Sequence, residues 1–283
     1  PSLSSYVRAR KLLKSHRLRD THLVIDGTNL CCQLYKVFEM SSSTANARLF
    51  RFGGDYRQFG GFIKDFFDKL AACNVVPIVV LDGALDKRVV PLKMARFEAG
   101  LELAKRMVRD EIEAAATDHD ADEDHLTSVR DVIFPKLQPF VFHQVLHELN
   151  VRTIYASYDA DVLIARIAMD LHYPVLSSDS DFYLLNLPGG VIPTTFLATT
   201  DVQLCYDHPE NDDKLEVQSQ PYLKCRIFHV TSLAQIEPNI VQVAAALLGN
   251  DHVSAKDAWT ACIKLGINVD KNNRHQQISR VSP

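Results

Sequence analysis

Acidic residues close several apolar runs of this sequence, at positions where they could share one site. Three of them follow a run rich in Val, Ile and Leu: Asp26, Asp82 and Asp179. Because ligands of open α/β sheets bind outside the carboxyl ends of the strands, these carboxylates are expected to project at one edge of a sheet. Two carboxylates about 4 Å apart repel by roughly 4 kcal/mol at an effective dielectric constant of about 20, so such a cluster is unfavourable unless it binds cations or protons. A single Asp-Gly after a strand, as at Asp26 or Asp82, usually marks only a turn, and that is the alternative for each position taken alone.

Two acid pairs with the spacing Asp-x-Asp indicate which cation the cluster would bind. The pairs are Asp159 with Asp161 and Asp179 with Asp181. Ligation by carboxylate oxygen alone, without His or Cys, favours Mg²⁺ or Mn²⁺ over Zn²⁺. Two such ions, roughly 4 Å apart, could activate a water and stabilise the leaving oxygen of a phosphodiester.

The composition suits an intracellular globular protein. With 283 residues, 47% of them hydrophobic, the chain can bury a large core in one or two domains. No apolar stretch reaches membrane-spanning length and the first residues are no secretory signal, so no membrane partner is expected. The six cysteines form no C-x-x-C pair and mostly stand in apolar surroundings, which predicts reduced, buried thiols. The sequence opens at Pro1 without Met, so residues are expected to precede it.

The charge distribution is uneven along the chain. The net charge of −4 argues mildly against a nucleic-acid binder, because phosphate binding depends on clustered Lys and Arg. Basic residues nevertheless gather at 8–19 and 87–109, while acids gather at 110–124 and 207–216. An acidic metal cluster would itself lower the net charge, so the total leaves both interpretations open.

The elements that would position the acids alternate between strands and helices. Short runs rich in branched residues predict buried parallel strands over 22–25, 77–81, 151–154 and 174–176. Apolar residues at helical spacing predict helices over 56–73, 139–149, 161–171 and 231–248. This alternation predicts an α/β fold, with a central, mainly parallel sheet flanked by helices on both faces. The stretch 191–230 looks instead like an antiparallel ribbon.

One segment, 84–135, does not belong to this alternation. Its first part, 93–109, is a long charged helical stretch, and the acidic run 118–124 that follows has no apolar content and is expected to be disordered. We interpret 84–135 as a helical, arch-like insertion over the carboxyl edge of the sheet, and an ordinary surface crossover is the alternative. Residues 1–269, with this insertion included, are predicted as a single domain, and 270–283 as a flexible polar tail.

Separated motifs resemble those of the flap-endonuclease/XPG-type nucleases in order and spacing. They are Val24-Ile-Asp-Gly27, Val80-Leu-Asp-Gly83, the acidic pair at 159–161, Ser177-Ser-Asp-Ser-Asp181 and Leu247-Leu-Gly-Asn-Asp251. Two segments look in particular like the asteroid branch of that superfamily: Arg51-Phe-Gly-Gly-Asp-Tyr56 and Leu248-Gly-Asn-Asp-His252. The resemblance covers about residues 1–255 and implies a PIN-like/5′-nuclease fold.

The same resemblance implies a phosphodiesterase with two divalent ions, Mg²⁺ or Mn²⁺. On that basis the first ion would be held by Asp26, Asp82, Asp159 and Asp161. The second would be completed by Asp179, Asp181 and Asp251. Lys93 and Arg96, neighbours at i, i+3 on one helix face of the insertion, are predicted to contact the scissile phosphate, with a solvated helix face as the alternative.

Two departures from the superfamily bear on activity and substrate. Asp159 and Asp161 stand where Glu is usual, and each side chain is shorter by one C–C bond, about 1.5 Å. After Asp251 the chain lacks the Gly-x-Gly pattern of the helix–two-turn–helix that grips duplex DNA, so a substrate with single-stranded character is favoured. Among aromatic residues that could stack on bases, Tyr35, Phe38 and Tyr56 fit core positions better.

Two functions from different classes follow. The first is a metal-dependent, structure-specific endonuclease acting on DNA with single-stranded character, such as single strands, overhangs or flaps. The second is a catalytically weak or inactive PIN-like scaffold that binds nucleic acid or a protein partner. A nuclear location, a role in DNA repair and repair proteins as partners are implied by the resemblance alone.

Overall fold

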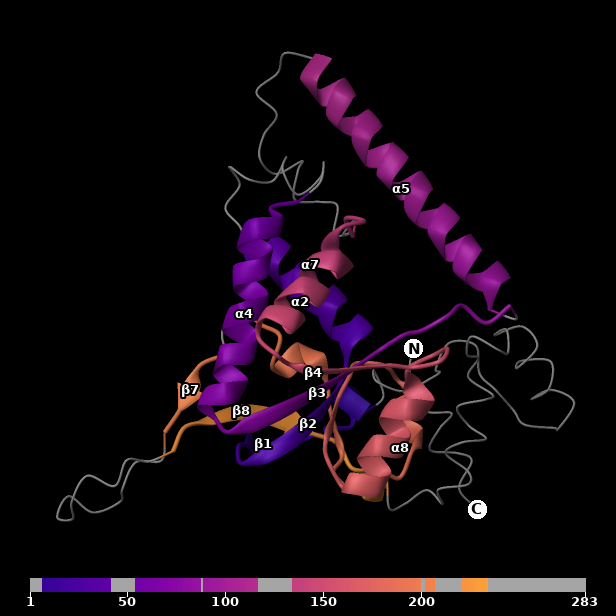
Figure 1. The fold of residues 1–283 in the computed structure, drawn as a ribbon. Helices are drawn as coiled ribbons and strands as arrows, with labels where there is room; N and C mark the ends of the chain where they lie inside the picture. Colours follow the sequence, from indigo (N-terminus) through magenta and orange to yellow (C-terminus); the bar gives the residue numbers. More distant parts are fainter. Residues whose placement is uncertain are drawn as a thin grey trace, which may run out of the picture.

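The structure is a computed structural model, and it describes residues 7–41, 54–87, 89–116, 134–199, 202–206 and 220–233 (Figure 1). Three predictions lie outside the described residues: the ligand role of Asp251, the acidic loop 118–124 and the tail 270–283. The predicted helix 231–248 is described only at its start, where a 3₁₀ helix, η4 (Val230–Leu233), begins.

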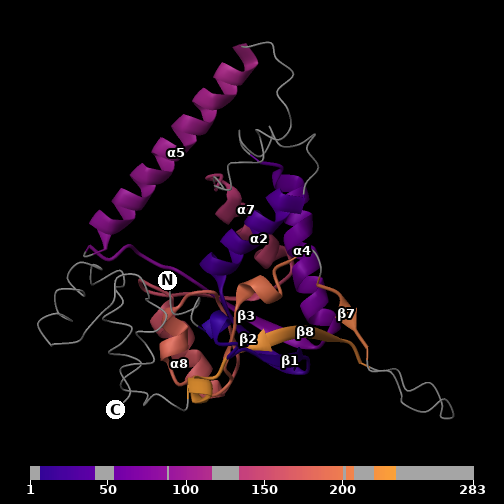
Figure 2. The same cartoon turned by 180° about the vertical axis from the view of Figure 1, so that it is seen from behind.

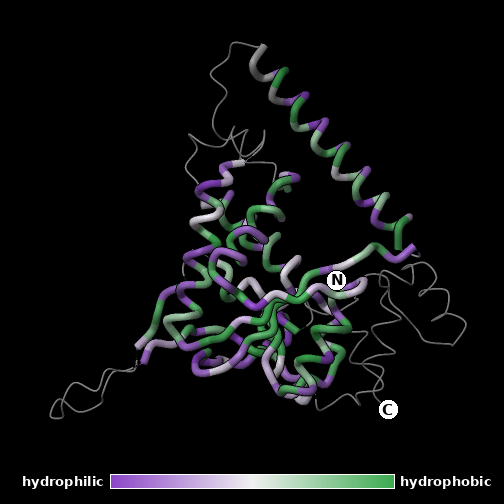
Figure 3. The backbone as a smooth tube through the Cα atoms, in the orientation of Figure 1, coloured by the Kyte–Doolittle hydropathy of each residue, from purple (hydrophilic) through white to green (hydrophobic). Residues whose placement is uncertain are grey.

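The centre of the molecule is a five-stranded sheet in which every neighbouring pair of strands is parallel. The strands lie in the order β4 (Arg152–Tyr155), β3 (Val75–Leu81), β2 (Thr21–Asp26), β5 (Val175–Leu176) and β6 (Val191–Ile192). Four of these five strands coincide with the predicted runs, and β6 forms where an antiparallel ribbon was predicted. The buried runs of Val, Ile and Leu make the tube hydrophobic through the centre of the molecule (Figure 3). The predicted α/β class, with a central, mainly parallel sheet, is thereby confirmed.

Successive side chains of these strands pack on opposite faces, which separates two cores. On one face Leu23 and Ile25 join a core with helices α2 (Gly27–Ser41), α4 (Tyr56–Ala72) and α7 (Gln138–Glu148). On the other face Val24 and Val80 pack against helix α8 (Asp161–Leu171). Figures 1 and 2 show the sheet between these two layers. Three of the four helices were predicted within two residues of their ends, whereas α2 was not predicted.

A second sheet closes the base of the molecule. It has the order β1 (Lys14–Leu18), β8 (Tyr222–Ile227), β7 (Leu204–Cys205), and all its pairs are antiparallel. The predicted ribbon within 191–230 is confirmed for β7 and β8, while β1 was not predicted. The inner residues of β1 and β8 join the core beneath α2 and α4: Leu18, Leu223, Cys225 and Ile227.

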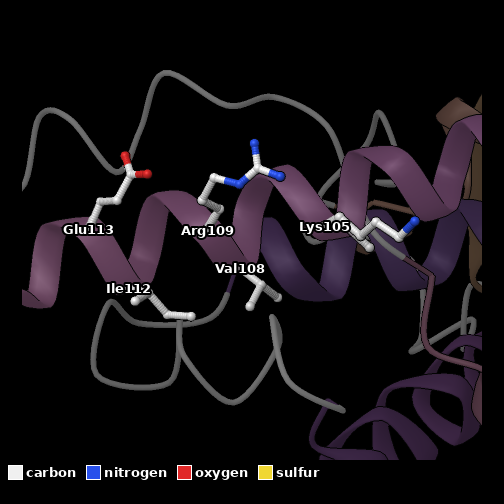
Figure 4. A pocket seen from close by; sticks show the side chains of 6 residues that line it. Lys105, Val108, Arg109, Ile112 and Glu113 are labelled. Carbon is white, nitrogen blue, oxygen red and sulfur yellow. The ribbon is translucent and has the colours of Figure 1, made fainter.

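The insertion is a single long helix in its described part. Helix α5 (Val90–Ala116) follows the carboxyl end of β3, which confirms the helical prediction for 93–109. It projects away from the layered body, and hydrophobic and hydrophilic residues alternate along it (Figures 1–3). A hollow on its carboxyl-terminal half is lined by Ala104, Lys105, Val108, Arg109, Ile112 and Glu113 (Figure 4).

Two further findings concern the cysteines and the helices of the described residues. All five described cysteines are free thiols, and Cys31, Cys73 and Cys225 are buried. None of the described helices is long and apolar enough to cross a membrane.

Candidate metal centre

Asp26 is the last residue of β2 and the buried centre of the candidate site. Its side chain is only 7% exposed. One carboxylate oxygen, Oδ1, accepts a hydrogen bond from the backbone N–H of Asn29 at 3.0 Å, and Oδ2 accepts one from the Ser177 hydroxyl at 2.8 Å. The first bond is that of a helix N-cap, so the same carboxylate starts α2. β2 and α2 therefore fix Asp26 at the carboxyl edge of the sheet.

Asp82 follows β3 and is fixed by the neighbouring loop. Its Oδ1 accepts a hydrogen bond from the backbone N–H of Ala160 at 3.0 Å, and its Oδ2 accepts one from the Thr28 hydroxyl at 3.1 Å. The N–H of Gly83 also donates to the Tyr158 carbonyl at 2.6 Å, which holds the exit of β3 beside the loop that carries the predicted acid pair.

The glycines after Asp26 and Asp82 serve close packing rather than a tight turn. Neither Gly27 nor Gly83 has a positive φ. A Cβ at Gly27 would lie 2.6 Å from Leu81 Cδ2, and one at Gly83 would lie 1.8 Å from the Ala156 carbonyl oxygen. Gly27 therefore lets the side chains of Leu81 and Val79 approach the end of β2, and Gly83 lets the backbone of Ala156 approach the end of β3.

The two Asp-x-Asp pairs have the same local geometry. The N–H of Asp161 donates to Asp159 Oδ1 at 3.0 Å, and the N–H of Asp181 donates to Asp179 Oδ1 at 3.1 Å. The second acid of each pair opens a helix: Asp161 begins α8, and Asp181 begins the 3₁₀ helix η2 (Asp181–Leu184). Both loops thus place two carboxylates side by side at the carboxyl edge of the sheet.

The electrostatics show that these acids share one site. Burial, with smaller contributions from Asp82 and Asp179, raises the pKa of Asp26 from 3.8 to about 6, against the lowering effect of its two hydrogen bonds. Burial raises the pKa of Asp161 to about 8, and four carboxylates contribute to that rise: Asp159, Asp179, Asp26 and Asp181. The six described acids of the prediction are therefore brought together, from the ends of β2, β3 and β5 and the loop after β4.

Sequence reasoning missed a polar network that ties these strand ends together. Asn29 Oδ1 accepts hydrogen bonds from the Ser178 N–H and from the Thr194 hydroxyl, both at 3.1 Å. Thr194, which is fully buried at the start of the 3₁₀ helix η3 (Thr194–Phe196), also lies 2.5 Å from the Ser178 hydroxyl. The strand-end Asp26 predicts a capped helix start, but the cap uses only the backbone N–H of residue 29, so the sequence carried no signal for the Asn29 side chain.

The acids fit a divalent cation in donor type and charge, but not yet in arrangement. In the ranges that the structure describes, no three His, Cys, Asp or Glu side chains are placed as they stand to hold a metal ion. Both oxygens of Asp26 and of Asp82 accept hydrogen bonds from the protein, and each oxygen keeps a second lone pair. Carboxylate oxygens suit Mg²⁺ or Mn²⁺, and a cation would relieve the repulsion felt by Asp161. Side-chain rotation would have to complete the ligand set.

The other predicted residues have mixed outcomes. Lys93 and Arg96 lie in the first two turns of α5, the end of this helix that is nearer to β3 in the chain, and their side chains are exposed. Their contact with the scissile phosphate stays a prediction. Tyr35 and Phe38 are buried, and the Tyr35 ring packs edge-on against Phe59 at 5.1 Å, which confirms them as core residues. Asp55 caps α4 by accepting a hydrogen bond from the N–H of Gln58.

Comparison with known proteins finds similar sequences over most of this chain. No protein-family model matches the sequence. The chain is 31% identical over 272 residues to the single-strand DNA endonuclease ASTE1 of Pongo abelii and 30% identical over 272 residues to that of Homo sapiens, in matches that cover 93% of this chain. The chain is thus similar to these proteins over most of its own length. Protein asteroid of Drosophila melanogaster is 28% identical over 292 residues, a match that covers 89% of this chain.

These matches extend over only part of the relatives. The chain spans about a third of their length: 35% of the two ASTE1 proteins and 31% of protein asteroid. Among solved structures, the catalytic core of Rad2 in complex with DNA substrate aligns with a TM-score of 0.46 and 14% identity, over 93% of this chain and 68% of that one. Human GEN1 in complex with Holliday junction DNA aligns with a TM-score of 0.46 and 12% identity, over 98% of this chain and 58% of that one.

Proposed function

We propose that this chain is a divalent-metal-dependent endonuclease that hydrolyses phosphodiester bonds in DNA with single-stranded character. The observation that carries the proposal is the convergence of Asp26, the Asp159–Asp161 loop and the Asp179–Asp181 loop, whose carboxylates together raise the pKa of Asp161. Such a concentration of acids destabilises a fold unless it binds cations. The names of the asteroid relatives, single-strand DNA endonucleases, support the same class of reaction.

The residues proposed to hold two Mg²⁺ or Mn²⁺ ions are the predicted acids: Asp26, Asp82, Asp159, Asp161, Asp179, Asp181 and Asp251. When bound, the ions would supply Lewis-acid activation of the attacking water and charge stabilisation at the leaving oxygen. The chain's own residues orient the acids before binding. Ser177 and the Asn29 N–H direct the two oxygens of Asp26, and Thr28 and the Ala160 N–H direct those of Asp82.

Two further roles follow from charge. Because its pKa is raised to about 8, the Asp161 carboxyl holds a proton near neutral pH, and cation binding would release that proton. We propose that Lys93 and Arg96, in the first turns of α5, approach the scissile phosphate and neutralise part of its developing charge.

The competing function is a scaffold that binds nucleic acid without efficient cleavage. It is favoured by one observation, the absence among the described residues of a formed three-ligand group.

The deciding experiment compares two substitutions on one helix. Asp161→Asn alters the first residue of α8, and Asp170→Asn alters an exposed residue of its last turn that pairs with Arg166. Both variants and the wild type are incubated with Mg²⁺ or Mn²⁺ and with labelled single-stranded, overhang and flap DNA. Because a lost metal ligand removes several kcal/mol of transition-state stabilisation, Asp161→Asn is expected to cleave at least about a hundredfold more slowly. Asp170→Asn is expected to match the wild type.

Three results would reject the proposal. If the wild type cleaves no substrate in either metal but binds DNA, the scaffold is the correct function. If Asp161→Asn and the wild type cleave equally, or cleavage survives an excess of EDTA, the acid cluster is not the catalytic centre.

A further inference from the structure

Thr194 carries a hydroxyl group in the buried interior beside the acid cluster. Four polar or charged residues of the described chain are buried, and three of them belong to this one region: Asp26, Ser177 and Thr194. Valine has nearly the same shape as threonine and buries no polar atom, so stability alone would favour valine at a fully buried position. The hydroxyl group of Thr194 is therefore explained by its contacts and not by its packing.

The hydrogen bonds of Thr194 have a fixed direction. Its hydroxyl group donates its single proton to Asn29 Oδ1 at 3.1 Å. Thr194 Oγ1 and Ser178 Oγ lie 2.5 Å apart, and because the Thr194 proton is already used, the Ser178 hydroxyl is the donor of this second bond. The backbone N–H of Ser178 also donates to Asn29 Oδ1, at 3.1 Å. Thr194 thus holds Ser178 directly and holds it again through Asn29.

Two routes of hydrogen bonds connect Asp26 to the loop that carries the second acid pair. In the first, the Ser177 hydroxyl donates to Asp26 Oδ2 at 2.8 Å and accepts from the N–H of Asp179 at 3.0 Å. In the second, the N–H of Asn29 donates to Asp26 Oδ1 at 3.0 Å, while the Asn29 side chain accepts from Ser178. Both oxygens of Asp26 are therefore linked to this loop, and Thr194 closes the second route.

The backbone alone gives this loop little support. Strand β5 has only two residues, each paired with one residue of β2 and one of β6. One further ladder bond follows, from the N–H of Ser177 to the Ile192 carbonyl at 3.1 Å. None of the described strands pairs with residues 178–181. The positions of the second acid pair therefore depend on side-chain hydrogen bonds, and Thr194 supplies those that come from the segment after β6.

We propose that Thr194 is a positioning residue of the metal centre, whose hydroxyl group fixes Ser178 and Asn29 and through them holds the second acid pair opposite Asp26. This inference rests on the proposed function, because it concerns acids that are proposed to hold the ions. Thr194 acts through its two partners and supplies no ligand of its own. Groups that orient metal ligands typically contribute about tenfold to a hundredfold to metal affinity or activity. Since Thr194 lies one step further from the ligands, we expect a contribution near the lower end of this range.

The test is Thr194→Val, which removes the hydroxyl group and keeps the volume of the side chain. Binding of Mn²⁺ is measured without DNA, from the electron paramagnetic resonance signal of the free ion, and its Kd is expected to rise about fivefold to tenfold. In metal-free protein, deuterium uptake by a peptide that contains residues 177–181 is expected to rise, because the N–H of Ser178 loses part of its protection. At limiting Mg²⁺, kcat is expected to fall while the KM for DNA stays that of the wild type, and excess Mg²⁺ should restore part of the rate.

Three further variants complete the design. Thr194→Ser keeps the hydroxyl group and is expected to bind Mn²⁺ nearly as tightly as the wild type, although the lost methyl group lowers its melting temperature. Thr21→Val is the matched control: it removes a hydroxyl that donates to the His22 carbonyl at 3.1 Å, at the opposite end of β2 from Asp26, and should leave Mn²⁺ affinity and kcat unchanged. Should Thr194→Val fold poorly, Ser178→Ala removes the donor to Thr194 and is expected to weaken Mn²⁺ binding in the same direction.

The outcomes separate this inference from the proposed function. If Thr194→Val only melts at a lower temperature and binds Mn²⁺ as tightly as the wild type, its role is purely structural and the inference is overturned. Equal weakening of Mn²⁺ binding by Thr194→Ser also overturns it, because the hydroxyl group would not be the cause. If Thr194→Val weakens Mn²⁺ binding but the wild type cleaves no DNA, the positioning role stands and the nuclease assignment fails. A wild type that binds no Mn²⁺ rejects both the metal centre and the role of Thr194.

Discussion

Replacing Asp26 with asparagine should make the metal-free protein more stable while removing its proposed activity. Asp26 is 7% exposed, and its pKa is raised from 3.8 to about 6. At about 1.4 kcal/mol for each pKa unit, keeping this carboxylate ionised costs the folded state about 3 kcal/mol at pH 8. The amide oxygen of the new side chain would accept from the Asn29 N–H, but its amide nitrogen cannot accept from the Ser177 hydroxyl, a loss of about 1 kcal/mol. The net gain expected for Asp26→Asn is therefore about 2 kcal/mol.

The sign of the pH dependence follows from proton binding. Because the folded state of the wild type binds its proton more tightly than the unfolded state, the wild type loses stability as the pH rises from about 4 to about 6. Asp26→Asn has no such proton to lose. The two proteins are expected to be about equally stable near pH 4.5, where the ionisation cost is about 1 kcal/mol and matches the lost hydrogen bond.

Thermal unfolding in EDTA at pH 4.5 and pH 8 tests this reasoning. At about 2–4 °C for each kcal/mol, Asp26→Asn should melt about 4–8 °C above the wild type at pH 8 and within about 2 °C of it at pH 4.5. Asp170→Asn, on the exposed end of α8, is the control and should show neither shift. If Asp26→Asn folds but melts at or below the wild type at pH 8, the buried charge is not the dominant cost at this site.

Three further predictions concern the same edge of the sheet. Gly83→Ala should lose about 1–3 kcal/mol in chemical unfolding, because its Cβ would lie 1.8 Å from a backbone carbonyl, while Gly61→Ala in α4, with nothing within 4 Å, should be neutral or stabilising. Ser177→Ala removes a donor to the ionised Asp26, so it should cost about 1–3 kcal/mol at pH 8 and less near pH 4, and a loss independent of pH would contradict this role. Mg²⁺ should raise the melting temperature more at pH 9 than at pH 6, because protons compete for Asp161, whose pKa is about 8; an equal rise at both values would refute the coupling.

The strand-end acids could be predicted from sequence because their signal is local. A buried parallel strand is a short run of branched residues, so the residue after it must lie at the carboxyl edge, as Asp26 and Asp82 do. The network around Asn29 and Thr194 could not be predicted this way. It joins residues 165 positions apart in the chain and depends on the pairing of β5 with β6. Each of these strands has two residues, too few to be recognised from the sequence pattern.

The miss at β1 has a different cause. Its sequence, Lys14-Ser-His-Arg-Leu18, has one buried apolar residue and two basic ones, so it was counted as part of a basic cluster instead of a strand. Only its pairing with β8, more than 200 residues later in the chain, makes this segment extended. Charge patterns alone therefore hid both the strand and the surface that it forms.

The turn at Asp159 gives a physical meaning to an aspartate at a position where the resemblance to flap-endonuclease/XPG-type nucleases leads one to expect glutamate. The Asp159 carboxylate closes onto the N–H of Asp161 through a hydrogen bond of 3.0 Å to a backbone group two residues away. Aspartate forms this local ring readily, and its one fewer rotatable bond leaves less side-chain entropy to lose on binding. The shorter side chains of the pair extend less far towards a cation, but the Asp159 carboxylate is already held in one orientation before the cation binds.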